Sequence, residues 1–140
     1  MNYNTISKSY NSLHKEEQLK KLELVSTILK VKETDKLLDV GCGTTISTNY
    51  FKCFSIGIDP SLEMLKLGEG NRVNAFAESL PFKENTFDIV LAITSIHNFN
   101  DVDNAIKEIK RVSKPNARIV ITLLKKSNKF NDIKSILFNN

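Results

Sequence analysis

An apolar run followed by two closely spaced glycines occurs at Lys36-Leu37-Leu38-Asp39-Val40-Gly41-Cys42-Gly43-Thr44-Thr45. The run predicts a short strand over 36–40, which the first glycine ends. Glycines at this spacing let the backbone turn tightly and approach a ligand without a Cβ in the way. The segment therefore predicts a strand with a ligand-binding loop at its carboxyl end.

Strands and helices alternate on both sides of this segment. Further strands are predicted over 54–58, 72–77, 87–93 and 119–124, and helices over 12–31, 44–52, 61–67, 101–114 and 129–138. Strands separated by crossover helices lie parallel, with right-handed connections. We therefore expect an α/β fold, a doubly wound Rossmann-like parallel sheet of about five strands in the order 3-2-1-4-5, with helices on both faces.

The predicted helices carry apolar faces and end signals. The first would bury Leu19, Leu22, Val25, Ile28 and Leu29. Gly68 can end the helix at 61–67 as a left-handed cap. Asp101 or Asp103 can cap the next helix, whose predicted buried stripe is Val102, Ala105, Ile106, Ile109 and Val112, and Pro115 ends it.

The composition is that of one globular domain. The chain has 140 residues, of which 41% are hydrophobic and 26% charged, close to globular averages. We expect a helical lid or cap over 1–35, a core over 36–124 and a basic helix over 125–140. No apolar run approaches the roughly 18 residues of a membrane span, and the polar start is no signal peptide. We therefore expect a soluble cytoplasmic protein with no membrane partner.

Cysteines, histidines and charges limit the ligand classes. Cys42 and Cys53 show no metal-ligand spacing with each other or with His14 and His97, so no metal site is expected. Residues 101–140 contain nine basic and four acidic side chains. RNA could bind through basic residues 107–134, although a solvated lysine face is the favoured interpretation.

A second acid, Asp59, ends the second predicted strand, 20 residues after Asp39. A carboxylate at that place can accept both hydroxyl protons of a ribose. The glycine loop and this acid fit a dinucleotide or S-adenosylmethionine. A dinucleotide fingerprint needs a third glycine where this chain has Ile46, and Asp39 could help to hold a cationic amino acid moiety. These details favour S-adenosylmethionine.

The chain resembles the class I S-adenosylmethionine-dependent methyltransferases, and most closely the type 11 subgroup. The resemblance covers about residues 10 to 124 and lies in these blocks: Leu38-Asp39-Val40-Gly41-Cys42-Gly43-Thr44, Gly57-Ile58-Asp59-Pro60-Ser61 with Met64-Leu65, Leu80-Pro81-Phe82 with Phe87-Asp88-Ile89-Val90, Ile96-His97, Asp101, Ala105, Glu108-Ile109, Arg111-Val112 and Lys114-Pro115.

The resemblance implies a cofactor site for S-adenosylmethionine, with S-adenosylhomocysteine as the product and no metal. The methionine portion would contact Asp39 and the backbone of Gly41, Cys42, Gly43 and Thr44. Asp59 would hold the ribose and Pro60 would lie beside the adenine. Ala77 and Glu78 would offer backbone to the adenine edge, Ile93 and Thr94 would close the pocket, and Tyr10 would act as a lid.

The chain also departs from the family pattern. Thr45 stands where a third glycine is usual, Phe76 where an acid often bonds the adenine amine, and Asn116-Ala117 where a Gly-Gly turn is usual. No room remains for the family's sixth and seventh strands, so the chain resembles a short form. The edge of the fifth strand would then need cover, and we expect a second copy or a protein partner there rather than the last helix.

Methyl transfer is an in-line displacement, so positioning can supply much of the catalysis. His97 could serve as a general base or only shape the pocket. The residues after the fourth strand lack the Pro-Pro-Tyr motif of adenine and glutamine amino-group methylation, and no cysteine is placed for a pyrimidine adduct. The acceptor can be a small molecule, RNA or a protein. A non-catalytic cofactor-binding or partner-binding subunit and a nicotinamide-dependent dehydrogenase are the alternatives.

Overall fold

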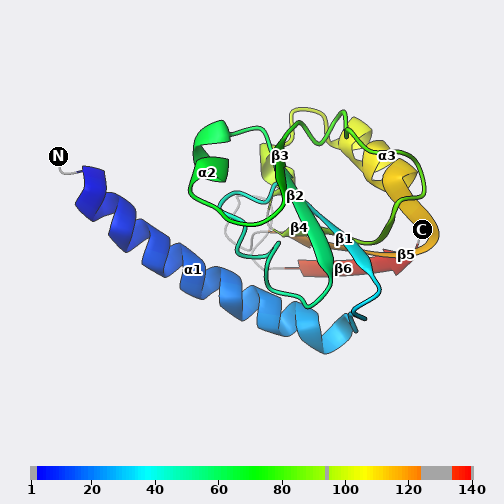
Figure 1. The fold of residues 1–140 in the computed structure, drawn as a ribbon, viewed down its shortest axis with the longest axis horizontal. Coiled ribbons are helices and arrows are strands. Elements are labelled where there is room, and N and C mark those ends of the chain that lie inside the picture. Colours follow the sequence, from blue (N-terminus) through cyan, green and yellow to red (C-terminus); the bar gives the residue numbers. More distant parts are fainter. Residues whose placement is uncertain (1–2, 94, 124–133, 140) are drawn as a thin grey trace.

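The computed structural model describes residues 3–93, 95–123 and 134–139. One sheet organises it, with six strands in the order β3-β2-β1-β4-β5-β6 (Figure 1). The strands are β1 (Lys36–Val40), β2 (Phe54–Asp59), β3 (Arg72–Asn74), β4 (Phe87–Ile93), β5 (Ser113–Leu123) and β6 (Lys134–Asn139). The first five are parallel, which confirms the predicted class and strand order, and β6 pairs antiparallel with β5.

Helices cover both faces of this sheet. They are α1 (Tyr3–Ile28), α2 (Leu62–Lys66) and α3 (Val102–Val112), with a single 3₁₀ turn, η1, over Ile96–Asn98. In Figure 1 α1 and α3 lie on opposite sides of the sheet, and the N-terminal end of α1 extends beyond it. None of the described helices has both the length and the apolar character that crossing a membrane requires.

The helix α1 docks through a stripe of buried residues that contains Gln18, Leu22 and Val25 and continues to Leu29, just beyond the end of the helix. The three apolar members pack with Leu37 of β1 and with β4 side chains. The prediction that Leu19 and Ile28 are buried was wrong, since they are 39% and 47% exposed. The spacing 18, 22, 25, 29 follows one helical face more closely than the predicted set.

The opposite face is covered by α3. Ala105, Ile109 and Val112 are buried against the sheet as predicted, while Val102 stays exposed. Of the two predicted caps, Asp101 is the N-cap, and its Oδ1 accepts the N–H of Asn104 at 3.2 Å. The helix ends at Val112, before Pro115, because β5 already begins at Ser113.

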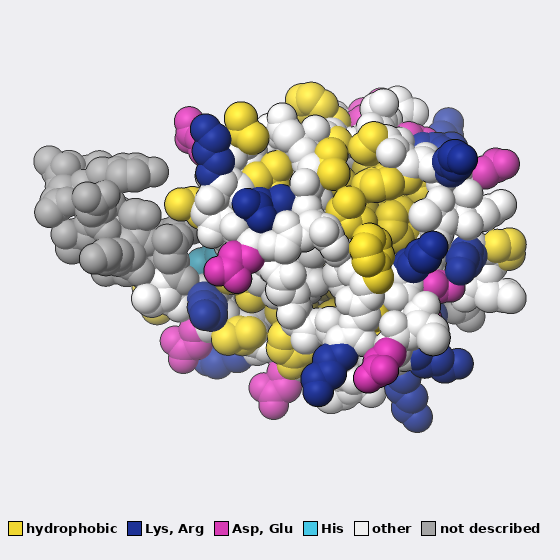
Figure 2. Space-filling model, in the orientation of Figure 1, with side chains coloured by type: hydrophobic (Ala, Val, Ile, Leu, Met, Phe, Trp, Pro, Cys, Tyr) yellow, Lys and Arg dark blue, Asp and Glu magenta, His cyan; other side chains and the backbone are white. Residues whose placement is uncertain are grey.

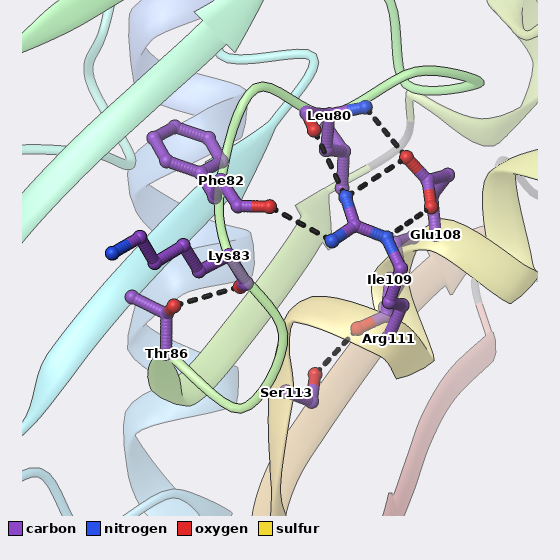
Figure 3. Close-up of polar contacts among 8 residues, drawn as sticks. All are labelled: Leu80, Phe82, Lys83, Thr86, Glu108, Ile109, Arg111 and Ser113. Carbon is purple, nitrogen blue, oxygen red and sulfur yellow. Dashed lines mark hydrogen bonds and ion pairs between the residues drawn. The ribbon is translucent and has the colours of Figure 1, made fainter.

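A guanidinium fixes the segment before β4 onto α3 (Figure 3). Arg111 donates to the carbonyl oxygens of Leu80 (3.0 Å) and Phe82 (2.8 Å) and to the carboxylate of Glu108 (2.5 Å). Glu108 also accepts the N–H of Leu80 at 2.9 Å, and its bond with Arg111 holds the pKa of this carboxyl below its usual value. The Glu108 and Arg111 motif is therefore explained by loop anchoring.

Three local predictions were wrong. Residues 44–52 form turns and bends rather than a helix, and the positive φ of 68° keeps Thr45 itself out of any helix. The third strand is shorter than predicted and ends at Asn74. Gly68 is not a left-handed cap. A Cβ there would lie 2.7 Å from Thr45 Oγ1, so close packing explains this glycine.

The end of the chain also differs from the prediction. Residues 134–139 form the strand β6 instead of a helix, while 124–133 lie outside the described residues. Six registered pairs, from Arg118↔Asn139 to Leu123↔Lys134, join β6 to β5. Pairing satisfies the backbone groups of the β5 edge, and Ile136 and Phe138 suit a strand. The expectation that a partner or a helix covers this edge was therefore wrong, and so was the expectation that no sixth strand fits.

The described surface carries mixed charge. On the face in Figure 2, acidic side chains lie between the lysines and arginines, and apolar side chains are visible among them. Lys114 pairs with Asp88 at 3.0 Å, so part of the basic region 107–134 is neutralised within the molecule. Residues 124–133 of that region lie outside the described residues.

Candidate functional site

A cavity of about 470 Å³ opens at the carboxyl ends of β1, β2 and β4. This volume is within the range of about 300–1,000 Å³ found for small-molecule sites, and the location is where parallel sheets bind ligands. The lining residues are His14, Gln18, Gly41, Cys42, Gly43, Ile58, Asp59, Pro60, Ser61, Met64, Phe76, Ala77, Glu78, Ile93, Ser95, Asn98, Phe99 and Asn100.

The glycine loop presents bare backbone to this cavity. The N–H groups of Gly41 and Cys42 both donate to the carbonyl of Ile58, at 2.8 and 2.9 Å. Gly41 has φ +75°, and a Cβ built on it would lie 2.4 Å from the Cβ of Ser95. Gly43 has φ +54° with only Met64 Cε nearby, at 3.6 Å. Only glycine therefore fits at 41, and at 43 the backbone conformation favours it.

The carboxylate of Asp59 ties this loop to β2. Its Oδ2 accepts the N–H of Gly43 at 2.9 Å, and its Oδ1 accepts the N–H of Ser61 at 2.8 Å. A carboxylate offers about four acceptor positions, so each oxygen keeps one for a ligand hydroxyl. Asp59 thus both shapes the loop and lines the cavity.

Asp39 lies beneath the loop and is not among the lining residues. Its Oδ2 accepts the hydroxyls of Ser47 (2.5 Å) and Thr48 (2.8 Å). Its Oδ1 is buried and has no hydrogen-bond partner among the described residues. Burial raises the pKa of Asp39 to about 6, and nearby Asp59 adds to this effect. A buried carboxylate with one free oxygen attracts a cationic hydrogen-bond donor.

The substitution of Thr45 for the usual third glycine is compensated locally. Thr45 keeps the positive φ of 68° that a glycine would adopt. Its Oγ1 accepts the N–H of Glu69 at 2.8 Å, and the side chain of Asn49 donates to its carbonyl at 3.1 Å. These bonds offset the cost of a non-glycine residue in the left-handed region.

The structure brings most of the predicted binding residues together. Those that line the cavity are Gly41, Cys42, Gly43, Asp59, Pro60, Ala77, Glu78 and Ile93. Thr44 lines a neighbouring pocket instead. Thr94 and the side chains of Tyr10 and His97 lie outside the described residues, so their predicted roles stay predictions. Phe76, which stands where the family often has an acid, lines the cavity and is 56% exposed.

Sequence reasoning missed part of the wall. His14 and Gln18 are one turn apart on α1, and both face the cavity. The helical spacing of Gln18 with Leu22, Val25 and Leu29 was the signal that could have revealed them. Burial lowers the pKa of His14. Ser95, whose hydroxyl donates to the carbonyl of Val40 at 2.8 Å, was also missed.

The thiol of Cys42, which lines the cavity, is not suited to act as a nucleophile. Burial raises the pKa of Cys42 to about 12, and the Asp39 carboxylate contributes. A thiol with such a pKa stays protonated and is a poor nucleophile. Among the described residues, no group of three or more histidine, cysteine or acidic side chains is placed to hold a metal ion.

Comparisons with known proteins agree with this site. The type 11 methyltransferase-domain family model matches residues 38–121. An uncharacterized protein of Methanocaldococcus jannaschii is 32% identical over 98% of this chain and 54% of its own length. A demethylmenaquinone methyltransferase of Streptomyces avermitilis is 34% identical over 69% of this chain and 46% of its own.

Solved structures show the same fold. A crystal structure from Thermotoga maritima, described as an S-adenosylmethionine-dependent methyltransferase and possible histamine N-methyltransferase, superposes with a TM-score of 0.74 at 24% identity. The match covers 86% of this chain and 58% of that one. The chain spans about half the length of the relatives it matches. It belongs to the class I S-adenosylmethionine-dependent methyltransferase family, type 11.

Proposed function

We propose that the 470 Å³ cavity binds S-adenosylmethionine and that the protein transfers the cofactor's methyl group to an acceptor. The observation that carries this proposal is the junction of the glycine loop with Asp59, where Gly43 N–H meets the carboxylate at 2.9 Å at the cavity wall. A nucleoside with a charged side arm needs a backbone segment that it can approach without meeting a Cβ. It also needs a hydrogen-bond acceptor for its ribose hydroxyls. Each is supplied here by a different strand end.

The charge of the wall supports a cationic cofactor over a dinucleotide. Its acidic residues are Asp59 and Glu78, and no lysine or arginine lines the described cavity. A pyrophosphate would be repelled there, whereas a sulfonium and an ammonium would be attracted. The unpaired Oδ1 of Asp39 lies under the same loop. A nicotinamide-dependent dehydrogenase is therefore disfavoured.

Several residues would hold the cofactor. The backbone of the 41–43 loop would receive its amino acid end, with Asp39 below. Asp59 would accept the ribose hydroxyls, and Ala77 and Glu78 would lie at the adenine. Bound S-adenosylmethionine supplies an electrophilic methyl group on a positively charged sulfur. The protein contributes alignment of the acceptor and exclusion of water.

The acceptor would approach past the carboxyl end of β4. The η1 turn there contains His97, which we propose as the base for an acceptor that must lose a proton. Because several relatives are named demethylmenaquinone methyltransferases, a quinone acceptor is the first class to test, ahead of RNA and protein. No finding favours the alternative of a non-catalytic subunit.

Thermal unfolding with added ligand tests this proposal. A ligand at 100 times its Kd stabilises the folded state by about 2.7 kcal/mol, which corresponds to a Tm increase of roughly 10 °C in a domain of this size. S-adenosylmethionine and S-adenosylhomocysteine should raise the Tm, and NAD serves as the control. A response to NAD alone would contradict the proposal.

A further inference from the structure

Gln18 is the polar exception in the stripe that docks α1. It is 8% exposed, against 0% for Leu22 and Val25 on the same helical face. Its side chain lines the cavity together with the glycine loop and Ser95. Its Oε1 is buried and accepts no hydrogen bond from any described residue.

This arrangement is unfavourable without a ligand. A buried acceptor that loses its water without gaining a donor destabilises the folded state. Docking of α1 does not need an amide, because the next three members of the stripe dock through apolar contacts alone. A leucine or methionine at 18 would fill the space and avoid the unpaired oxygen. A hydrogen-bond donor that enters the cavity would satisfy it.

The second unpaired oxygen identifies the kind of donor. Asp39 follows Leu37 by two residues on β1, and alternate residues of a strand face the same side. Leu37 packs against the stripe of α1, so Asp39 also faces the α1 side of the sheet. Its buried Oδ1 is likewise without a partner among the described residues. Gln18 lines the cavity, and Asp39 lies on the same side of the sheet, two residues before Gly41 of the cavity wall. This arrangement favours a donor with several N–H groups and a positive charge.

We propose that Gln18 is a further binding residue for the cofactor, and that its side-chain carbonyl accepts a hydrogen bond from the α-ammonium group of S-adenosylmethionine. This inference rests on the proposed function. It assigns to α1 a direct part in binding, beyond covering the sheet. Gln18 would bind the amino end while Asp59, which accepts the N–H of Gly43, would bind the ribose.

Calorimetric titration of four proteins with two ligands tests the assignment. The proteins are the wild type, Gln18→Met, Gln18→Glu and the control Leu22→Met, one turn along the stripe and outside the cavity. The ligands are S-adenosylhomocysteine and its analogue without the amine, 5′-S-(3-carboxypropyl)-5′-thioadenosine. Together they form a cycle that isolates the contact between residue 18 and the amine.

Gln18→Met should bind S-adenosylhomocysteine about 10- to 100-fold more weakly than the wild type, as expected for a lost hydrogen bond to a charged group. It should bind the analogue with unchanged affinity. Gln18→Glu keeps an acceptor and should retain binding of S-adenosylhomocysteine. Without ligand, Gln18→Met should melt at the wild-type temperature or above it, because the unpaired oxygen is gone.

The outcomes separate this inference from the proposed function. If the wild type binds neither ligand, the proposed function is wrong and the inference falls with it. If the wild type binds S-adenosylhomocysteine and Gln18→Met binds it equally well, only the inference is overturned. The inference would also be overturned if Gln18→Met lost the same affinity for both ligands, or if Leu22→Met lost as much affinity as Gln18→Met. Either result would mean that the effect comes from helix docking.

Discussion

Replacing Gly41 by alanine tests whether the loop geometry is as tightly constrained as the structure indicates. The new Cβ would lie 2.4 Å from Ser95 Cβ and 2.8 Å from Ser95 Oγ, well inside contact distance. The residue would also have to keep φ at +75°. We therefore expect Gly41→Ala to destabilise the fold through two separate effects.

The magnitudes of the two effects can be estimated. A non-glycine residue in the left-handed region costs roughly 1–2 kcal/mol. Overpacking against Ser95 adds about 1–3 kcal/mol, for a total of about 2–5 kcal/mol. Gly43→Ala is the matched control, because its Cβ would meet only Met64 Cε at an ordinary 3.6 Å. It should show the conformational cost alone, about 1–2 kcal/mol.

Urea unfolding of the single and double variants measures these two contributions to the free energy of unfolding. Ser95→Gly removes the clashing atoms but also the hydroxyl bond to Val40, a loss of about 1 kcal/mol by itself. Combined with Gly41→Ala, it should recover about 1–3 kcal/mol in a double-mutant cycle. If Gly41→Ala is no less stable than Gly43→Ala, or if Ser95→Gly recovers no stability, the close approach of the loop to Ser95 is wrong.

Three further predictions concern buried charges and anchors. The folded-state pKa of Asp39 is raised to about 6, so its effect on stability is most favourable below the unfolded value of 3.8 and is lost as the pH rises through 6. The unfolding free energy should fall by up to about 3 kcal/mol over that range, and urea titrations of Asp39→Asn should lack this slope. Arg111→Met should lower the unfolding free energy by about 1–3 kcal/mol without changing the affinity for S-adenosylhomocysteine, and a changed affinity in calorimetry would contradict its purely structural role. Asp59→Ala should weaken S-adenosylhomocysteine binding by roughly 2–4 kcal/mol. It should also lower the Tm, because the N–H groups of Gly43 and Ser61 lose their acceptor. A loss of binding at an unchanged Tm would contradict the role of Asp59 in anchoring the loop.

Sequence periodicity was sufficient for the parallel sheet, and residue chemistry was sufficient for the glycine loop and Asp59. The family resemblance supplied Pro60, Ala77, Glu78 and Ile93 of the cavity wall. The strands at 36–40 and 87–93 are apolar almost throughout and lie in the middle of the sheet. The two glycines and Asp59 were predicted together because their roles follow from local backbone chemistry, which a sequence displays directly.

The errors arose where tertiary contacts override local preference. The turns over 44–52 depend on the hydroxyl of Thr45 reaching the backbone of Glu69, 24 residues away. In β6, the three consecutive apolar residues Ile136, Leu137 and Phe138 fit a helix or a strand about equally, and pairing with β5 decides between them. Gln18 was missed because a polar residue on a helical face is usually exposed, and only the sheet beneath α1 makes it buried.

The glycine loop is held before any ligand arrives, and the Gly57-Ile58-Asp59 segment explains how. A Cβ on Gly57 would lie 2.6 Å from both Cβ and Sγ of Cys42. The strand β2 therefore needs a residue without a side chain where the loop packs against it. One residue later, the carbonyl of Ile58 accepts two loop N–H groups, and Asp59 accepts a third. Binding to a loop fixed at three points costs less ordering free energy than binding to a mobile one. Gly57 would therefore contribute to the affinity for the proposed cofactor without lining the cavity. Gly57→Ala should weaken binding of S-adenosylhomocysteine in calorimetry by displacing Cys42, and an unchanged affinity would contradict this reasoning.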